Sequence, residues 1–218
     1  WRRNFIQTFL ERDLPQLGIT VPARTLGRFW NMLAHYHGQV WNASEFAKSL
    51  GISAKTATRY LDLLTDAYVL RQLEPWHANI KKRQVKSPKI YLRDSGLLHA
   101  LLGLGEEEGI LGHPKCGASW EGFALEQIAH LGPFEELFHW GTHAGAEIDV
   151  LGFCRGRKYG FEIKLSDAPT RTKSMHIAVE NLELEKLFVI YPGSTAYDLS
   201  HSVRVIPIGE LPEVLREI

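Results

Sequence analysis

The stretch that decides the fold is Ala146-Glu147-Ile148-Asp149-Val150-Leu151, followed after a short basic turn by Tyr159-Gly160-Phe161-Glu162-Ile163-Lys164. Side chains on a β-strand alternate between its two faces. Alternation groups Ile148 with Val150 on an apolar face, and likewise Phe161 with Ile163. If the runs pair as a hairpin, the other face brings together Asp149, Glu162 and Lys164. Two carboxylates and an ammonium group there are suited to holding a divalent metal near a phosphate.

Length and composition place the chain among ordinary globular proteins. Its 218 residues are 44% hydrophobic and 23% charged, which suits one large domain or two small ones. No apolar run approaches the roughly 18 to 20 residues of a membrane span, and there is no signal peptide, so we expect no membrane partner. Cys116 and Cys154 have neither zinc spacing nor the number for a disulfide framework, which favours a reducing, cytoplasmic location. The chain begins at Trp1 inside a predicted helix, so we expect a fragment of a longer protein.

Charge is divided unequally along the chain, although the net charge is zero. Residues 1–95 hold 15 lysines and arginines against 7 acids, a net charge of +8. Residues 96–218 hold 10 basic residues against 18 acids, a net charge of −8. A basic half followed by an acidic half predicts two domains with different roles. The basic half suits a polyanion, and we expect DNA as its partner.

The basic half is predicted to be helical. Residues 1–20 are expected to form a connecting helix, and residues 21–103 look like a winged helix-turn-helix. Helices are expected at residues 22–36, 45–50 and 54–67, strands at 68–73 and 89–92, and a further helix at 95–102. Ser44 and Ser53 are expected to cap the second and third helices, with Gly51 making the turn between them.

Basic residues follow the predicted third helix and the wing. That helix would enter a major groove with Lys55 and Arg59 exposed. Residues 81–93 carry six basic residues and no acid. The candidate nucleic-acid contacts are Lys55, Arg59, Lys81, Lys82, Arg83, Lys86 and Lys89. Winged helices also serve as protein-interaction modules, and a charge run is often a solvated loop, so both alternatives stay open.

Residues 104–218, which make up most of the acidic half, show a different order of elements. After a loop at residues 103–116 we expect a helix at 118–130 and a strand at 137–140, and then the two opening strands. A helix at 172–182, strands at 185–191 and 203–208, and a helix at 209–218 complete the pattern. The order begins helix, three strands, helix, strand, which gives a mixed α+β or α/β fold class.

This order resembles the PD-(D/E)xK, or restriction-endonuclease-like, fold. Asp149 is followed by twelve residues, then Glu162, one residue and Lys164, and Glu121 lies in the first helix. The resemblance implies a Mg²⁺-dependent nuclease in which Asp149 and Glu162 bind the metal, Lys164 orients water or neutralises the phosphate, and Glu121 is a further ligand. Ile148 stands where the family pattern has proline. The alternative is an exposed Glu162–Lys164 ion pair beside an ordinary surface Asp149.

Several short motifs resemble a more specific family, the uncharacterised C-terminal region of prokaryotic AAA-type ATPases. They are Glu11-Arg12-Asp13-Leu14-Pro15, Lys86-Ser87-Pro88-Lys89-Ile90-Tyr91 with Asp94-Ser95-Gly96-Leu97, Trp120-Glu121-Gly122-Phe123, Glu147-Ile148-Asp149 and Phe161-Glu162-Ile163-Lys164. The resemblance implies an N-terminal ATPase domain upstream, and ATP would bind only there because this chain has no G-x-x-x-x-G-K-[S/T] motif. We therefore expect a DNA-binding, nuclease-like region; the alternative is a non-catalytic protein-interaction or regulatory module of the ATPase. Oligomer formation is left open.

Overall fold

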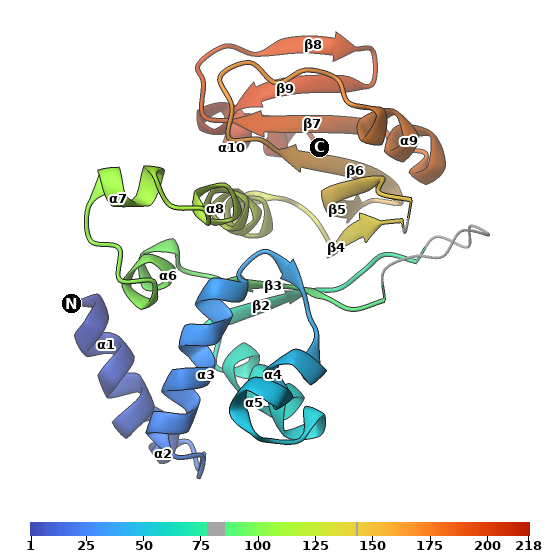
Figure 1. Cartoon of the computed structure of the whole chain (residues 1–218). Coiled ribbons are helices and arrows are strands. Elements are labelled where there is room, and N and C mark those ends of the chain that lie inside the picture. Colours follow the sequence, from blue (N-terminus) through green and yellow to red (C-terminus); the bar gives the residue numbers. More distant parts are fainter. Residues whose placement is uncertain (78–85, 143) are drawn as a thin grey trace. The chain divides into compact units, whose positions relative to one another are not determined.

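A computed structural model describes residues 1–77, 86–142 and 144–218, which form a mixed α+β protein with two β-sheets (Figure 1). The chain divides into two compact units. The first comprises Trp1–Gln72 and Ile90–Gly122, and the second comprises Leu73–Lys89 and Phe123–Ile218. The boundary expected near residue 103 lies inside the first unit. Within the described ranges, no helix is both long enough and apolar enough to cross a membrane.

Helices dominate the first unit. They are α1 (Arg2–Thr8), the π-helical turn η1 (Phe9–Asp13), α2 (Leu14–Gln16), α3 (Ala23–Tyr36), α4 (Ala43–Leu50), α5 (Ala54–Asp66), α6 (Ser95–Leu101), α7 (Glu107–Leu111) and the beginning of α8 (Cys116–Leu131). The predicted first helix is therefore divided into three segments. Its Phe9 ring packs against Trp30 of α3, which is fully buried in the core of this unit.

Capping side chains define the ends of several helices. The Ser53 hydroxyl accepts a hydrogen bond from the Thr56 amide, as predicted for the start of α5. The predicted Ser44 cap of α4 is wrong, because the Asn42 side chain accepts from the Ser44 amide and α4 begins one residue before Ser44. Gly51 ends α4 with a φ of 66°, a conformation that glycine adopts without steric cost. The predicted loop at residues 103–116 contains α7.

A small sheet lies in the first unit, except for its end residues Leu73 and Lys89, which belong to the second. Its strands are β1 (Gln39–Val40), β2 (Leu70–Leu73) and β3 (Lys89–Leu92), in the order β1-β3-β2. The bounds of β3 are those predicted. The strand predicted from residue 68 begins two residues later, and Tyr68 has a φ of 60°, which lies outside the extended region.

A six-stranded sheet forms the centre of the second unit. Its strands are β4 (Glu136–Gly141), β5 (Glu147–Cys154), β6 (Arg157–Ile163), β7 (Lys186–Tyr191), β8 (Tyr197–Ser200) and β9 (Val203–Pro207), in the order β4-β5-β6-β7-β9-β8. The β4-β5-β6 part is antiparallel, whereas β7 runs parallel to both β6 and β9. The edge strand β8 was not predicted. A 3₁₀ turn, η2 (Ile208–Glu210), leads into α10 (Leu211–Glu217).

Helix α9 (Lys173–Leu182) connects β6 to β7 and covers one face of this sheet (Figure 1). Its buried residues Met175, Ala178 and Leu182 belong to one core with apolar side chains of β5, β7 and β9. Burial of that apolar face is the main source of stability for a helix of this length. The core fixes the position of β5, and β6 is held between β5 and β7 by hydrogen bonding; these two strands, β5 and β6, carry the predicted acidic residues.

Candidate functional site

A bulge in β5 positions the first candidate residue. Phe138 of β4 pairs with Leu151, and Trp140 pairs with Ile148, so β5 contains one more residue than β4 between these pairs. Asp149 and Val150 together lie opposite His139, which is the arrangement of a β-bulge. Ile148 consequently shares its core with Leu151, and the strict alternation that grouped Ile148 with Val150 does not hold here. Bulges re-aim side chains, and this one includes Asp149.

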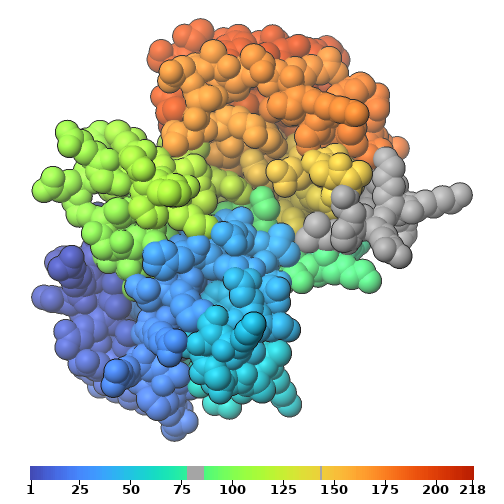
Figure 2. Space-filling view, viewed as in Figure 1, coloured from blue at the N-terminus to red at the C-terminus, as the bar shows by residue number. Residues whose placement is uncertain are grey.

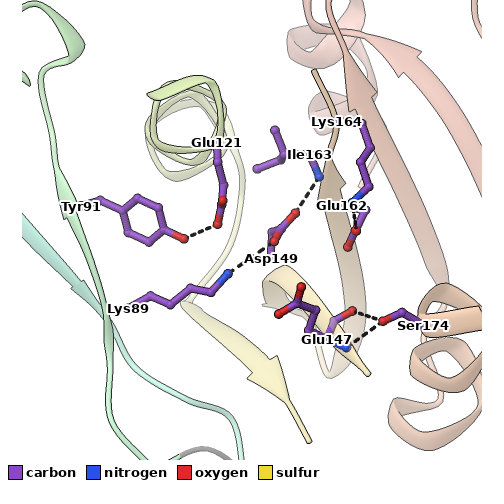
Figure 3. Close-up of polar contacts among 9 residues, drawn as sticks. All are labelled: Lys89, Tyr91, Glu121, Glu147, Asp149, Glu162, Ile163, Lys164 and Ser174. Atoms are coloured by element: carbon purple, nitrogen blue, oxygen red, sulfur yellow. Dashed lines mark hydrogen bonds and ion pairs between the residues drawn. The ribbon is translucent and has the colours of Figure 1, made fainter. Parts of the chain in front are cut away.

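Asp149 is buried and bound through both carboxylate oxygens. Its Oδ2 accepts a hydrogen bond from the Ile163 amide of β6 at 2.9 Å. Its Oδ1 lies 3.4 Å from Nζ of Lys89, and each of these two side chains is only 11% exposed (Figure 3). Asp149 is therefore an internal ion-pair partner and not the ordinary surface residue of the alternative interpretation.

Glu162 lies on the neighbouring strand. The β5–β6 register pairs Val150 with Phe161, and one further step places Asp149 opposite Glu162. Glu162 is 4% exposed, and its Oε1 forms an ion pair with Nζ of Lys164 at 2.6 Å. Its Oε2 is buried and has no hydrogen-bond partner among the described residues. Burial, followed by the charge of Asp149, raises the pKa of Glu162 to about 7.

Lys164 completes the predicted set. Its amide donates to the Ile190 carbonyl of β7 at 2.9 Å, while its side chain is 40% exposed. Burial lowers the pKa of Lys164, but Glu162 and then Asp149 and Glu147 offset that effect, so the pKa is raised overall. The predicted residues Asp149, Glu162 and Lys164 are thus brought together. The Glu162–Lys164 ion pair of the alternative interpretation is present, but its carboxylate is buried rather than exposed.

Lys89 joins this group although the sequence assigned it to nucleic-acid contact. Ser87, two residues earlier, is held because its carbonyl accepts a hydrogen bond from Nε2 of His139 at 3.2 Å. Burial lowers the pKa of His139 to about 4, so the ring is neutral at pH 7 and Nε2 carries its proton. The backbone of His139 also bonds to Glu74 and Trp76. Nothing in local spacing predicts the Lys89–Asp149 contact, because 60 residues separate the pair.

Glu121 belongs to the first unit, where the buried His37 bonds to the backbone of neighbouring elements. The Tyr91 hydroxyl of β3 hydrogen-bonds to Oε1 of Glu121 (Figure 3). The ring of His37 packs edge-on against Tyr91. Nδ1 of His37 accepts from the Leu92 amide at 2.9 Å, which leaves Nε2 protonated to donate to the Ala118 carbonyl at 3.0 Å. Burial lowers the pKa of His37 to about 4, consistent with this neutral form.

The residue after Glu121 is Gly122, and His37 lies too close to it for a larger residue. A Cβ atom on Gly122 would lie 2.5 Å from Nε2 and 2.8 Å from Cε1 of His37. Distances below about 3 Å are not tolerated without displacement of the neighbouring atoms. In the Trp120-Glu121-Gly122 motif, the glycine therefore allows the helix to lie close to His37. This close approach places the Glu121 carboxylate next to Tyr91.

The candidate nucleic-acid residues are distributed over both units. Lys55 and Arg59 are exposed on α5, and α4 and α5 contribute to the surface in Figure 2. Lys86 is also exposed. Lys81, Lys82 and Arg83 lie outside the described residues, so the structure gives no position for them.

The pair of carboxylates is compatible with a hard divalent cation. Across the described part of the chain, no three or more His, Cys, Asp or Glu side chains are grouped so that they could hold a metal ion. Asp149 and Glu162 together provide two carboxylates. Oε2 of Glu162, which has no hydrogen-bond partner among the described residues, is an oxygen ligand of the kind that Mg²⁺ prefers. Mg²⁺ commonly binds through one or two carboxylates and keeps several water ligands. The predicted pair therefore fits such an ion.

Comparison with known protein families finds two models that match parts of this chain. Residues 1–108 match the domain of unknown function DUF8612, and residues 116–211 match the domain of unknown function DUF4143. The chain is 51% identical over 211 residues to the uncharacterized proteins Mb2031c of Mycobacterium bovis and Rv2008c of Mycobacterium tuberculosis. These matches cover 97% of the chain but 48% of each relative, so the chain spans about half of their length.

A solved structure is also similar to this chain. It is the crystal structure of protein VC1899 from Vibrio cholerae, with a TM-score of 0.30 and 11% sequence identity. The match covers 99% of this chain and 53% of that protein.

Proposed function

We propose that the second unit is a PD-(D/E)xK nuclease-like domain that carries out Mg²⁺-dependent phosphodiester hydrolysis. The observation that carries the proposal is the buried Oε2 of Glu162, which lies next to Asp149 and has no hydrogen-bond partner in the part of the chain that the structure describes. An unsatisfied buried carboxylate oxygen costs free energy, and a bound cation would remove that cost. The order of strands and the position of α9 are compatible with the proposed fold.

Each residue of the site has a role in this proposal. Asp149 and Glu162 would hold Mg²⁺, which when bound lowers the pKa of water and stabilises charge on phosphate oxygens. A backbone contact fixes the Asp149 carboxylate, because its Oδ2 accepts a hydrogen bond from the Ile163 amide of the next strand. Lys164 is partly exposed and 2.6 Å from Glu162, so its ammonium group can face both the carboxylate and an incoming phosphate.

We further propose that the first unit is a winged helix that binds DNA. Helices α3, α4 and α5 followed by the strands of the small sheet support this, as do the exposed Lys55 and Arg59 on α5. In the full-length protein, we propose an ATP-binding domain of AAA type N-terminal to this region. The matched relatives are about twice as long as this chain, which leaves room for such a domain.

The decisive test is cleavage of duplex and single-stranded DNA with Mg²⁺ or with EDTA, comparing the native chain with Asp149→Asn and Glu162→Gln. The proposal predicts Mg²⁺-dependent products that both variants lose. Cleavage that persists unchanged in both variants would show that another protein is responsible. Binding to DNA should be measured at low salt, where phosphate contacts are strongest. No binding there would remove the winged-helix proposal.

The second candidate function is a non-catalytic regulatory or protein-interaction module. One observation favours it: the Lys89 ammonium group contacts Asp149, and both carboxylates are buried. In this alternative the charged group stabilises the fold, so Asp149→Asn would alter thermal stability while no DNA cleavage occurs under any metal condition.

A further inference from the structure

We propose that Lys89 is an internal counter-ion of Asp149, and that a divalent cation binds the Asp149/Glu162 pair only by displacing the Lys89 ammonium group. The inference rests on the metal site of the proposed function and adds that the Lys89 ammonium group competes with the cation for Asp149. It begins from the contact of 3.4 Å between Nζ of Lys89 and Oδ1 of Asp149. Both side chains are 11% exposed, so water screens this ion pair much less than it screens a surface pair.

The carboxylate oxygens limit how a cation can enter. Oδ2 of Asp149 accepts from the Ile163 amide, and Oε1 of Glu162 pairs with Lys164. Of the four oxygens, Oε2 of Glu162 alone lacks a hydrogen-bond partner among the described residues. A cation shared by both carboxylates therefore needs an oxygen of Asp149 as well. Oδ1 is the accessible choice, since Oδ2 is held by the backbone of a central strand.

Charge balance leads to the same conclusion. With both carboxylates ionised, Lys89 and Lys164 cancel their two negative charges within the unit. A divalent cation entering this group would meet two nearby ammonium groups. Lys164 is 40% exposed and can turn towards solvent, but Lys89 is nearly enclosed. Repulsion between Lys89 and the cation is consequently the larger obstacle.

The backbone next to Lys89 is anchored, which keeps the ammonium group near Asp149. Ser87 is fixed through its carbonyl by His139, a residue of β4 that lies opposite the Asp149 bulge. The same residue binds the backbone of Glu74 and Trp76. The backbone of Glu74, Trp76 and Ser87 is thus held at the strand beside the site. Displacement of Lys89 then requires rotation of its side chain and does not require release of Ser87.

The test is Mn²⁺ binding to the 218-residue chain by isothermal titration calorimetry. Lys89→Met removes the charge and keeps the apolar stem, and we expect it to bind Mn²⁺ at least about tenfold tighter than the native chain, equivalent to ~1.4 kcal/mol. Lys89→Arg keeps the charge and should bind as the native chain does. Lys86→Met is the matched control, because it removes an exposed lysine from the same segment and should leave the affinity unchanged.

Protein stability provides a second readout. Mn²⁺ should raise the melting temperature of Lys89→Met more than that of the native chain, because tighter binding to the folded state stabilises it more. If Lys89→Met does not fold, Lys89→Gln replaces it, since an amide can still hydrogen-bond to Asp149 without a charge.

The outcomes separate this inference from the proposed function. Equal Mn²⁺ affinity in the native chain and Lys89→Met would refute the counter-ion role and leave the metal site standing. Weaker binding by Lys89→Met would also refute it, because Lys89 would then support the site. No binding by any of these proteins up to about 10 mM Mn²⁺ would overturn the metal site and the inference together.

Discussion

The close approach of His37 to Gly122 predicts that two glycine substitutions in the same helix have opposite effects on protein stability. Gly117 and Gly122 both lie in α8 and within the first unit. A Cβ on Gly117 would meet nothing within 4 Å, whereas one on Gly122 would lie 2.5 Å from Nε2 of His37. Gly117→Ala should therefore stabilise the protein and Gly122→Ala should destabilise it.

The magnitude follows from two opposing terms. Replacing helical glycine by alanine gains about 0.4 to 1 kcal/mol, because the unfolded chain loses conformational freedom. Overpacking a filled core typically costs about 1 to 3 kcal/mol. His37 cannot move aside cheaply, since its two ring nitrogens bond to Leu92 and Ala118. We expect Gly117→Ala to gain about 0.5 kcal/mol and Gly122→Ala to lose about 1 to 2 kcal/mol, a difference of roughly 2 kcal/mol between the variants.

Urea denaturation followed by far-UV circular dichroism gives the unfolding free energies. Hydrogen exchange of the Leu92 amide reports locally, because this N–H donates to His37 and should exchange faster in Gly122→Ala than in Gly117→Ala. If Gly122→Ala is as stable as Gly117→Ala and its Leu92 amide is equally protected, the clash with His37 is absent and the reasoning fails.

Three further predictions concern acid stability, the buried ion pair and DNA. The pKa of His37, about 4 in the folded chain against an ordinary 6.5, means that its stabilising contribution is complete above 6.5 and is lost as the pH falls towards 4; the loss is on the order of 3 kcal/mol. In urea titrations across this range, His37→Gln should flatten the pH dependence and the exposed His35→Gln should not; equal profiles would refute the assignment. Asp149→Ala should lower the unfolding free energy by about 3 kcal/mol in thermal or urea unfolding, because the substitution breaks the buried Lys89–Asp149 ion pair; a change below about 1 kcal/mol would contradict a buried ion pair. Replacing Lys55 and Arg59 by alanine should reduce the slope of log affinity against log salt by about 2 in fluorescence anisotropy with duplex DNA; an unchanged slope would exclude α5 from phosphate contact.

Local sequence patterns were sufficient for much of the fold. The strand β3 and the Ser53 cap of α5 were predicted, because propensity and capping act over a few residues. The mixed α+β class and the approach of Asp149, Glu162 and Lys164 also followed from strand patterns. The winged-helix and PD-(D/E)xK assignments remain predictions.

The features that were missed depend on pairing over long distances. The Asp149–Val150 bulge exists only in relation to β4, so alternation within β5 could not reveal it. The Lys89–Asp149 contact joins residues 60 positions apart, and the His37–Ala118 bond joins residues 81 apart. The Ser44 cap failed for a local reason, since Asn42, two residues earlier, is an equally good capping residue.

The interleaving of the two units has a consequence for inheritance and dissection of this region. The chain passes from one unit to the other after Gln72, after Lys89 and after Gly122, so no single cut separates them. A fragment starting at residue 104 would keep Asp149 and Glu162 but lack Lys89 and the Ser87 carbonyl that His139 holds. The two units therefore cannot be exchanged independently between proteins. Recombination at a single junction would transfer Asp149 and Glu162 without Lys89. We expect the two units to be inherited together.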